Sequence, residues 1–100
     1  MNDLEGKVAI VTGASRGIGK AIAENLAAGG AFVLGTATTD TGAASISSYL
    51  AENGRGFVLR VDEDESIEHF FSAIKGEFDA PRILVNNAGI TRDNIALRMK

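Results

Sequence analysis

The amino-acid sequence predicts an α/β fold built around a doubly wound parallel sheet. Four short apolar segments rich in β-branched residues alternate with three segments whose apolar residues recur at helical spacing. Helices of roughly 10–15 residues between strands indicate right-handed βαβ units, which pack on both faces of a parallel sheet. A glycine-rich segment directly follows the first strand. Residues 1–100 are therefore expected to form the N-terminal β-α-β-α-β-α-β portion of a single Rossmann-type domain.

The first strand and the first helix have the clearest patterns. Val8–Thr12 is a short apolar run between two glycines, which is typical of a buried strand. Over residues 17–28, Ile18, Ile22 and Leu26 are spaced by four and predict one apolar face of a helix. The glycine pair that follows predicts the end of this helix.

The second strand and helix repeat this arrangement. Ala31–Thr36 predicts a strand, and a helix is expected over about 41–53. Ile46 and Leu50 lie on one face of that helix, and an Asn-Gly pair at its end predicts its termination.

The third helix is expected between two further strands, Gly56–Val61 and Ile83–Asn86. Asp62 and Glu65 have the spacing of a capping box, which predicts that the helix begins there and runs to about Glu77. Its expected buried residues are Ile67, Phe70, Phe71 and Ile74.

The predicted sheet leaves its fourth strand at an edge. A parallel strand is normally buried on both faces and has neighbours on both sides. We therefore expect residues 1–100 to be one part of a domain that continues past Lys100.

Composition and charge exclude several other classes of protein. Apolar residues make up 45% and charged residues 23% of the chain, so disorder is not expected. The absence of cysteine excludes disulfides and thiolate chemistry, in keeping with a cytoplasmic location. A net charge of −3 gives no electrostatic basis for binding nucleic acid or an anionic membrane. The sequence also contains neither an apolar run of roughly 20 residues nor a signal peptide.

The segment after the first strand has the chemistry of a pyrophosphate site. Glycines at positions 13, 17 and 19 let the backbone approach a phosphate, and the N-terminus of the following helix offers free N–H groups. A tight turn without a ligand is the alternative. A phosphate-loop motif does not fit, because Gly13 and Gly19 enclose five residues rather than four and Lys20 is followed by Ala21.

Two motifs resemble those of the short-chain dehydrogenase/reductase family. Thr12-Gly13, Gly17 and Gly19 follow the pattern Thr-Gly-x-x-x-Gly-x-Gly, and Asn86-Asn87-Ala88-Gly89 follows the fourth predicted strand. More narrowly, the whole chain resembles the 3-oxoacyl-acyl-carrier-protein reductases of fatty acid synthesis. This resemblance implies NADPH-dependent reduction of a 3-oxoacyl thioester on acyl carrier protein to the 3-hydroxyacyl form. It also implies a homotetramer.

The resemblance further implies which residues hold the cofactor. These residues are Gly13, Ala14, Ser15, Arg16, Gly17, Ile18, Gly19, Thr38, Arg60, Val61, Asn87, Ala88 and Gly89. The predicted preference for NADPH over NADH has two grounds. The end of the second strand holds no carboxylate to repel a 2′-phosphate, and Arg16 is similar in position to the arginine that grips this phosphate in the family. A solvated surface arginine is the alternative for Arg16.

Two positions depart from the family pattern. Arg60 stands where the family usually has Asp or Asn, and a guanidinium cannot accept a hydrogen bond from the adenine amino group. Stacking of Arg60 on the ring and the Val61 backbone are the remaining means of holding adenine. Pro81-Arg82 replaces the Val-Asp pair that the family favours. We interpret this as a change in the local structure at the start of the strand rather than in the chemistry of the site.

The chain holds no candidate for the general acid. The family uses a tyrosine with a lysine four residues later, but the single tyrosine, Tyr49, is followed at that distance by Asn53. Tyr49 is therefore interpreted as a packing residue. The catalytic Ser, Tyr and Lys are expected beyond Lys100, so residues 1–100 alone are predicted to be inactive. No metal site is expected at His69 or in the acidic run at 62–65.

Two other functions remain open from the sequence. One is a short-chain reductase that acts on a different carbonyl substrate. The other is a non-catalytic nucleotide-binding or subunit-pairing module.

Overall fold

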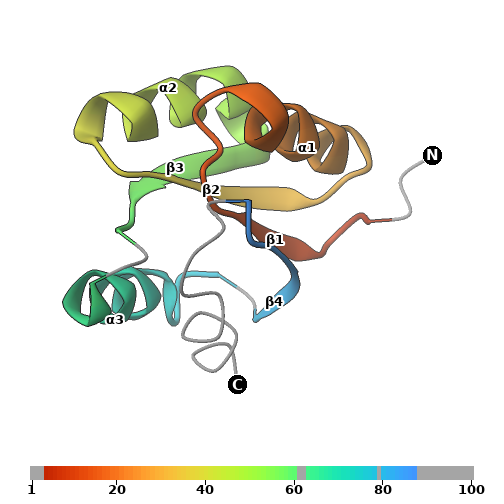
Figure 1. The fold of residues 1–100 in the computed structure, drawn as a ribbon. Coiled ribbons are helices and arrows are strands. Elements are labelled where there is room, and N and C mark those ends of the chain that lie inside the picture. The colour runs from red at the N-terminus through yellow and green to blue at the C-terminus, as the bar shows by residue number, and fades with distance from the viewer. Residues whose placement is uncertain (1–3, 61–62, 79, 88–100) are drawn as a thin grey trace.

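The computed structural model describes residues 4–60, 63–78 and 80–87, and it confirms the predicted α/β fold (Figure 1). Four parallel strands form one sheet in the order β3-β2-β1-β4. Helices α1 and α2 cover one face and α3 covers the other. The elements are β1 (Val8–Val11), α1 (Gly17–Ala28), β2 (Phe32–Ala37), α2 (Asp40–Leu50), the 3-10 helix η1 (Ala51–Asn53), β3 (Gly54–Val58), α3 (Asp64–Ile74) and β4 (Pro81–Val85).

Strand β1 lies at the point where the order of strands reverses. The chain moves outward from β1 through β2 to β3 and then crosses to the other side of β1 to form β4. Because such crossovers are right-handed, the reversal of direction puts α3 on the face opposite α1 and α2. Ligands of open α/β sheets bind beside the carboxyl ends of the strands at this reversal. Here those ends carry the segments that follow β1 and β4.

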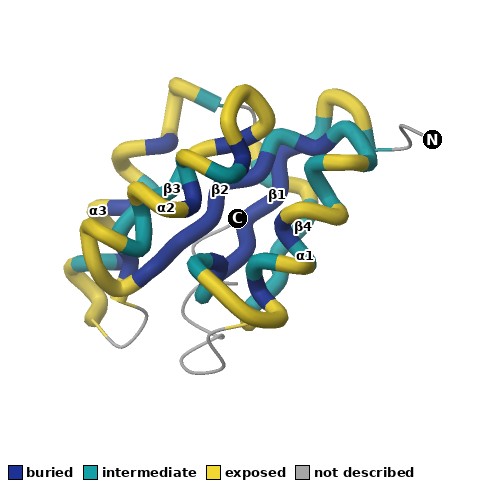
Figure 2. The backbone as a smooth tube through the Cα atoms, turned by 90° about the horizontal axis from the view of Figure 1, so that it is seen from above, coloured by how far each residue is buried: buried dark blue, intermediate teal, exposed yellow. Residues whose placement is uncertain are grey.

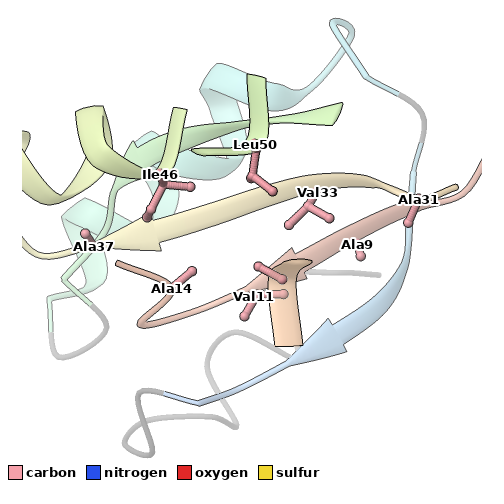
Figure 3. Packing of buried hydrophobic residues seen from close by; sticks show 9 residues of the cluster. Ala9, Val11, Ala14, Ala31, Val33, Ala37, Ile46 and Leu50 are labelled. Atoms are coloured by element: carbon pink, nitrogen blue, oxygen red, sulfur yellow. The ribbon is translucent and has the colours of Figure 1, made fainter. Parts of the chain in front are cut away.

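Small apolar residues fill the layer between the sheet and the pair α1 and α2 (Figure 3). Val11 of β1, Val33 of β2, and Ile46 and Leu50 of α2 all belong to this layer, and all four are at most 2% exposed. A Cβ on Gly35 would lie 2.8 Å from the Ile46 Cγ2 atom, so α2 rests directly on the backbone of β2. The glycine in β2 thus sets how closely α2 approaches the sheet.

Larger residues fill the layer on the opposite face. Ile10 and Leu34 alternate with the residues of the first layer along β1 and β2, and they pack with Ile67 and Phe70 of α3. The two central strands are buried along their whole length except at Phe32 (Figure 2). In contrast, the described residues of β4 are only partly buried or exposed, as its edge position predicts.

The apolar face predicted for α1 is wrong at its first residue. Ile22 and Leu26 are partly buried, but Ile18 is 73% exposed. The fully buried residues of α1 are instead Gly19 and Ala23. The helix therefore approaches the sheet along its small residues, and this contact stripe is rotated by about 100° from Ile18.

Helix α2 and strand β3 also differ from the predicted bounds. Helix α2 ends at Leu50, and the last predicted turn is the 3-10 helix η1. The change coincides with Ala51, which has a positive φ of 52°. Strand β3 begins two residues earlier than predicted and ends at Val58.

The predicted capping box of α3 is not the observed N-terminus of the helix. Glu63 is the N-cap and makes no side-chain capping hydrogen bond, whereas Asp62 lies outside the described residues. Ile67, Phe70 and Ile74 are buried as predicted, and Phe71 is half-buried. Within the described part of the chain, no helix has the length and apolar character needed to cross a membrane.

The contrast between two isoleucines tests this packing. Ile46→Ala is expected to lower the free energy of unfolding by about 2–5 kcal/mol, because it opens a cavity in a fully buried layer. Ile18→Ala is the matched control and should change it by no more than about 0.5 kcal/mol. Urea unfolding of the purified variants measures both values. Equal losses would contradict the placement of Ile18 on the surface.

Candidate dinucleotide-binding site

The turn between β1 and α1 uses the conformational freedom of glycine twice. Gly13 and Gly17 have φ values of +63° and +66°, a region that other L-residues rarely occupy. Gly13 turns the chain directly after β1, and Gly17 starts α1. The glycine-rich segment therefore forms a compact strand-to-helix turn, as the sequence predicts.

Gly19 allows α1 to pass unusually close to this turn. A Cβ at position 19 would lie 2.1 Å from the Gly13 carbonyl oxygen and 2.7 Å from the Asn87 Nδ2 atom. Both distances are shorter than real Cβ atoms tolerate, so only glycine fits here. The absence of a side chain at Gly19 brings the N-terminus of α1 up to the ends of β1 and β4.

The segment after β4 is joined to the glycine-rich turn by hydrogen bonds. The Asn87 amide nitrogen donates to the Gly13 carbonyl at 3.1 Å. Nearby, the Thr12 hydroxyl donates to the Asn86 Oδ1 atom at 3.0 Å, and the Thr12 N–H donates to the Val85 carbonyl. The two sequence motifs, separated by more than 70 residues, therefore form one structural unit.

Asn86 contributes a second polar group at this point. Its Nδ2 atom is buried and has no hydrogen-bond partner among the described residues. Buried donors in native proteins are nearly always paired. This nitrogen is thus an unused donor beside the carboxyl ends of β1 and β4.

The backbone of Ala14 is held from two sides. Its N–H donates to the Thr36 carbonyl in β2 at 2.9 Å. Its carbonyl accepts a hydrogen bond from the Tyr49 hydroxyl in α2, at 2.6 Å. The turn is therefore fixed to the second strand and the second helix as well as to β4.

Tyr49 does more than the packing that the sequence predicts. Its ring packs against the apolar layer under α2, while its hydroxyl reaches the turn. Desolvation by burial, together with the charge of Glu24, raises the pKa of Tyr49 to about 12. The hydroxyl consequently stays protonated and donates at neutral pH. No spacing rule could have found this contact, because its partners are 35 residues apart.

The electrostatics of the turn favour an anion. Arg16 is the N-cap of α1 and is exposed, and its side chain has no ion-pair partner among the described residues. The first turn of α1 holds no acidic residue, and Lys20 lies one turn further on. The positive end of the helix dipole adds to this charge.

The remaining predicted site residues lie at the same edge of the sheet where they are described. Thr38 is exposed just after β2, and the Leu59 N–H donates to the Ala37 carbonyl, which brings the segment after β3 beside it. Arg60 is exposed, and its N–H donates to the Ser66 hydroxyl at 2.8 Å. Val61, Ala88 and Gly89 lie outside the described residues.

An open depression of about 450 Å³ adjoins Arg60. It is lined by Val58, Arg60, Glu63, Glu65, Ser66 and His69. Within the described ranges, no group of His, Asp and Glu residues is arranged to hold a metal ion. The depression offers a mixed polar surface next to the ends of the strands.

This fold and its glycine-rich turn define a Rossmann-type protein of the short-chain dehydrogenase class. The chain belongs to the short chain dehydrogenase family, whose pattern matches residues 7–100. It is also similar to curated 3-oxoacyl-acyl-carrier-protein reductases. The identity is 64% with that of Vibrio cholerae and 60% with that of Escherichia coli, each over 98% of this chain, and 54% with that of Pseudomonas aeruginosa over 97%. The chain spans about 40% of the length of these relatives.

Substitution of Gly19 tests the close approach of α1. Alanine normally stabilises a helix interior by about 1 kcal/mol over glycine. Here the clash with the Gly13 carbonyl reverses the sign, and Gly19→Ala is expected to lower the free energy of unfolding by about 1–3 kcal/mol. Denaturant titration gives the value. The exposed Ala21→Gly variant of the same helix is the control for propensity, and a stabilised Gly19→Ala protein would contradict the geometry.

Proposed function

We propose that this chain forms the NADPH-binding N-terminal part of a 3-oxoacyl-acyl-carrier-protein reductase. The complete enzyme reduces a 3-oxoacyl thioester carried on acyl carrier protein to the 3-hydroxyacyl form, in fatty acid synthesis. The identity of 54–64% to reductases of that name, over nearly the whole chain, supports this substrate class. A homotetramer and a cytoplasmic location are part of the same proposal.

The observation that carries the cofactor assignment is the Arg16 guanidinium at the glycine-rich turn, which has no ion-pair partner among the described residues. Arg16 is exposed at the N-terminus of α1, where the backbone N–H groups are free. The nearby end of β2, Thr36 to Thr38, holds no carboxylate that would repel a 2′-phosphate. A Cβ on Gly17 would meet nothing within 4 Å, so the backbone there is open to a pyrophosphate, whereas Gly19 lets α1 pack closely against Gly13. The residues present therefore fit a phosphorylated dinucleotide.

When bound, NADPH supplies the hydride that reduces the 3-oxo group. The described residues bind and orient its adenosine and pyrophosphate end. The glycine-rich turn and the N-terminus of α1 would hold the pyrophosphate, and Arg16 and Thr38 would hold the 2′-phosphate. Asn87 fixes the turn through its hydrogen bond to Gly13. Arg60 would hold the adenine through stacking, since a guanidinium cannot accept a hydrogen bond from the amino group.

Tyr49 does not supply the proton in this proposal. Its hydroxyl donates to the Ala14 carbonyl, and its pKa of about 12 makes it a poorer acid than free tyrosine. A catalytic tyrosine needs the opposite shift, toward the operating pH. The proton donor and the residues that support it therefore belong to a part of the protein beyond Lys100, and residues 1–100 alone are expected to have no turnover.

Loss of the Arg16 side chain tests the cofactor preference. Arg16→Ala is expected to weaken NADPH binding by about 10- to 100-fold, because charge-assisted hydrogen bonds to the 2′-phosphate are lost. NADH binding should change little. Fluorescence titration of the full-length protein with each cofactor measures both dissociation constants. Arg82→Ala removes the same charge from exposed β4 and serves as the control. Equal effects on the two cofactors would contradict the role of Arg16.

The substrate class is tested by steady-state kinetics of the full-length protein with NADPH. Rapid reduction of an acetoacetyl thioester on acyl carrier protein, with slow reduction of unrelated ketones, is the expected result. Preference for another carbonyl would make the protein a different short-chain reductase. Cofactor binding without any turnover would instead favour a non-catalytic nucleotide-binding or subunit-pairing module.

A further inference from the structure

The hydrogen bond between Tyr49 and the glycine-rich turn falls on a particular peptide unit. The Tyr49 hydroxyl donates to the carbonyl of Ala14, and the other half of that peptide is the N–H of Ser15. No peptide bond among the described residues is cis. In a planar trans peptide the C=O and the N–H point in opposite directions. Tyr49 thereby directs the Ser15 N–H away from α2.

The neighbouring peptide unit is held as well. The Ala14 N–H donates to the Thr36 carbonyl at 2.9 Å, and Ala14 itself is fully buried. With both backbone groups of Ala14 bound, the chain leaves this residue in a fixed direction. Arg16 follows two residues later and is exposed. The anchored backbone therefore determines where the Arg16 backbone lies, and the exposed Arg16 side chain starts from that position.

Tyr49 is rigid enough to act on the turn in this way. Its helix is fixed to the sheet by Ile46 and Leu50, which are at most 2% exposed, and by the Ser47 hydroxyl, which accepts a hydrogen bond from the Gly56 N–H at 2.8 Å. The Lys20 ammonium of α1 lies 5.1 Å from the centre of the Tyr49 ring. The raised pKa keeps the hydroxyl a donor well above neutral pH.

We propose that Tyr49 is a positioning residue for the 2′-phosphate end of the cofactor site, acting through the Ala14–Ser15 peptide on the Ser15 N–H and on Arg16. This inference rests on the proposed NADPH-binding function. A tyrosine in the second helix thus contributes to the discrimination between NADPH and NADH without touching either cofactor. The part of the site that binds the pyrophosphate, which is common to both cofactors, depends on Gly13, Gly17 and Gly19 instead.

Tyr49→Phe tests this role, because it removes the hydroxyl and keeps the ring. Titration of the full-length protein is expected to give a dissociation constant for NADPH about three- to tenfold higher, the effect of one hydrogen bond. The constant for NADH should change little, so the ratio of the NADPH constant to the NADH constant rises by about the same three- to tenfold. This ratio does not depend on the fraction of protein that is folded. A thermal scan of each variant measures any general loss of stability separately.

Ser48→Ala is the matched control, since it removes an exposed hydroxyl from the adjacent position of α2. It should leave both dissociation constants unchanged. If Tyr49→Phe weakens NADPH and NADH equally, or leaves the ratio unchanged while lowering thermal stability, Tyr49 only braces the fold and the inference is wrong. If the wild-type protein itself shows no preference for NADPH, the proposed function fails, and the role of Tyr49 that rests on it fails as well.

Discussion

The candidate site depends on the close approach of three backbone segments at the Gly13 carbonyl. The Asn87 amide donates to this oxygen, and α1 passes so near that a Cβ on Gly19 would overlap it. Any side chain at Gly19 would push α1 away from the ends of β1 and β4. The helix N-terminus would then no longer lie beside the glycine-rich turn. The glycines of the turn therefore determine the shape of the site before any charged residue acts.

The topology of the sheet makes this approach possible. Because the strand order reverses at β1, the segments after β1 and β4 leave neighbouring strands at the same edge. The turn is then fixed on its other side by Thr36 of β2 and Tyr49 of α2. Helix α1, the segment after β4, strand β2 and helix α2 thus all contact the backbone of Gly13 and Ala14. A turn held this firmly presents its N–H groups without reorganisation, and the exposed Arg16 lies at its end.

Much of the fold was predictable, because its elements follow from local patterns. The β-branched runs, the helical spacing and the glycine positions predict all four strands, three helices and the turn, and the structure confirms them to within a few residues. Ile18 shares the spacing of Ile22 and Leu26 but is exposed, since spacing alone does not say which stripe of α1 faces the sheet. The helix faces the sheet with its smallest residues, Gly19 and Ala23, because they allow the closest approach.

The amino-acid sequence by itself determined the class of fold, the glycine-rich turn and the motif after the fourth strand, because each follows from a pattern of residues close together in the sequence. Only the tertiary structure decided how these parts meet. The contacts of Asn87 with Gly13 and of Tyr49 with Ala14 join residues 74 and 35 positions apart. Such contacts depend on the strand order and on the rotation of each helix about its axis. Strand order and helix rotation are properties of the packed chain, because a close-packed interior accommodates only one arrangement of its helices and strands.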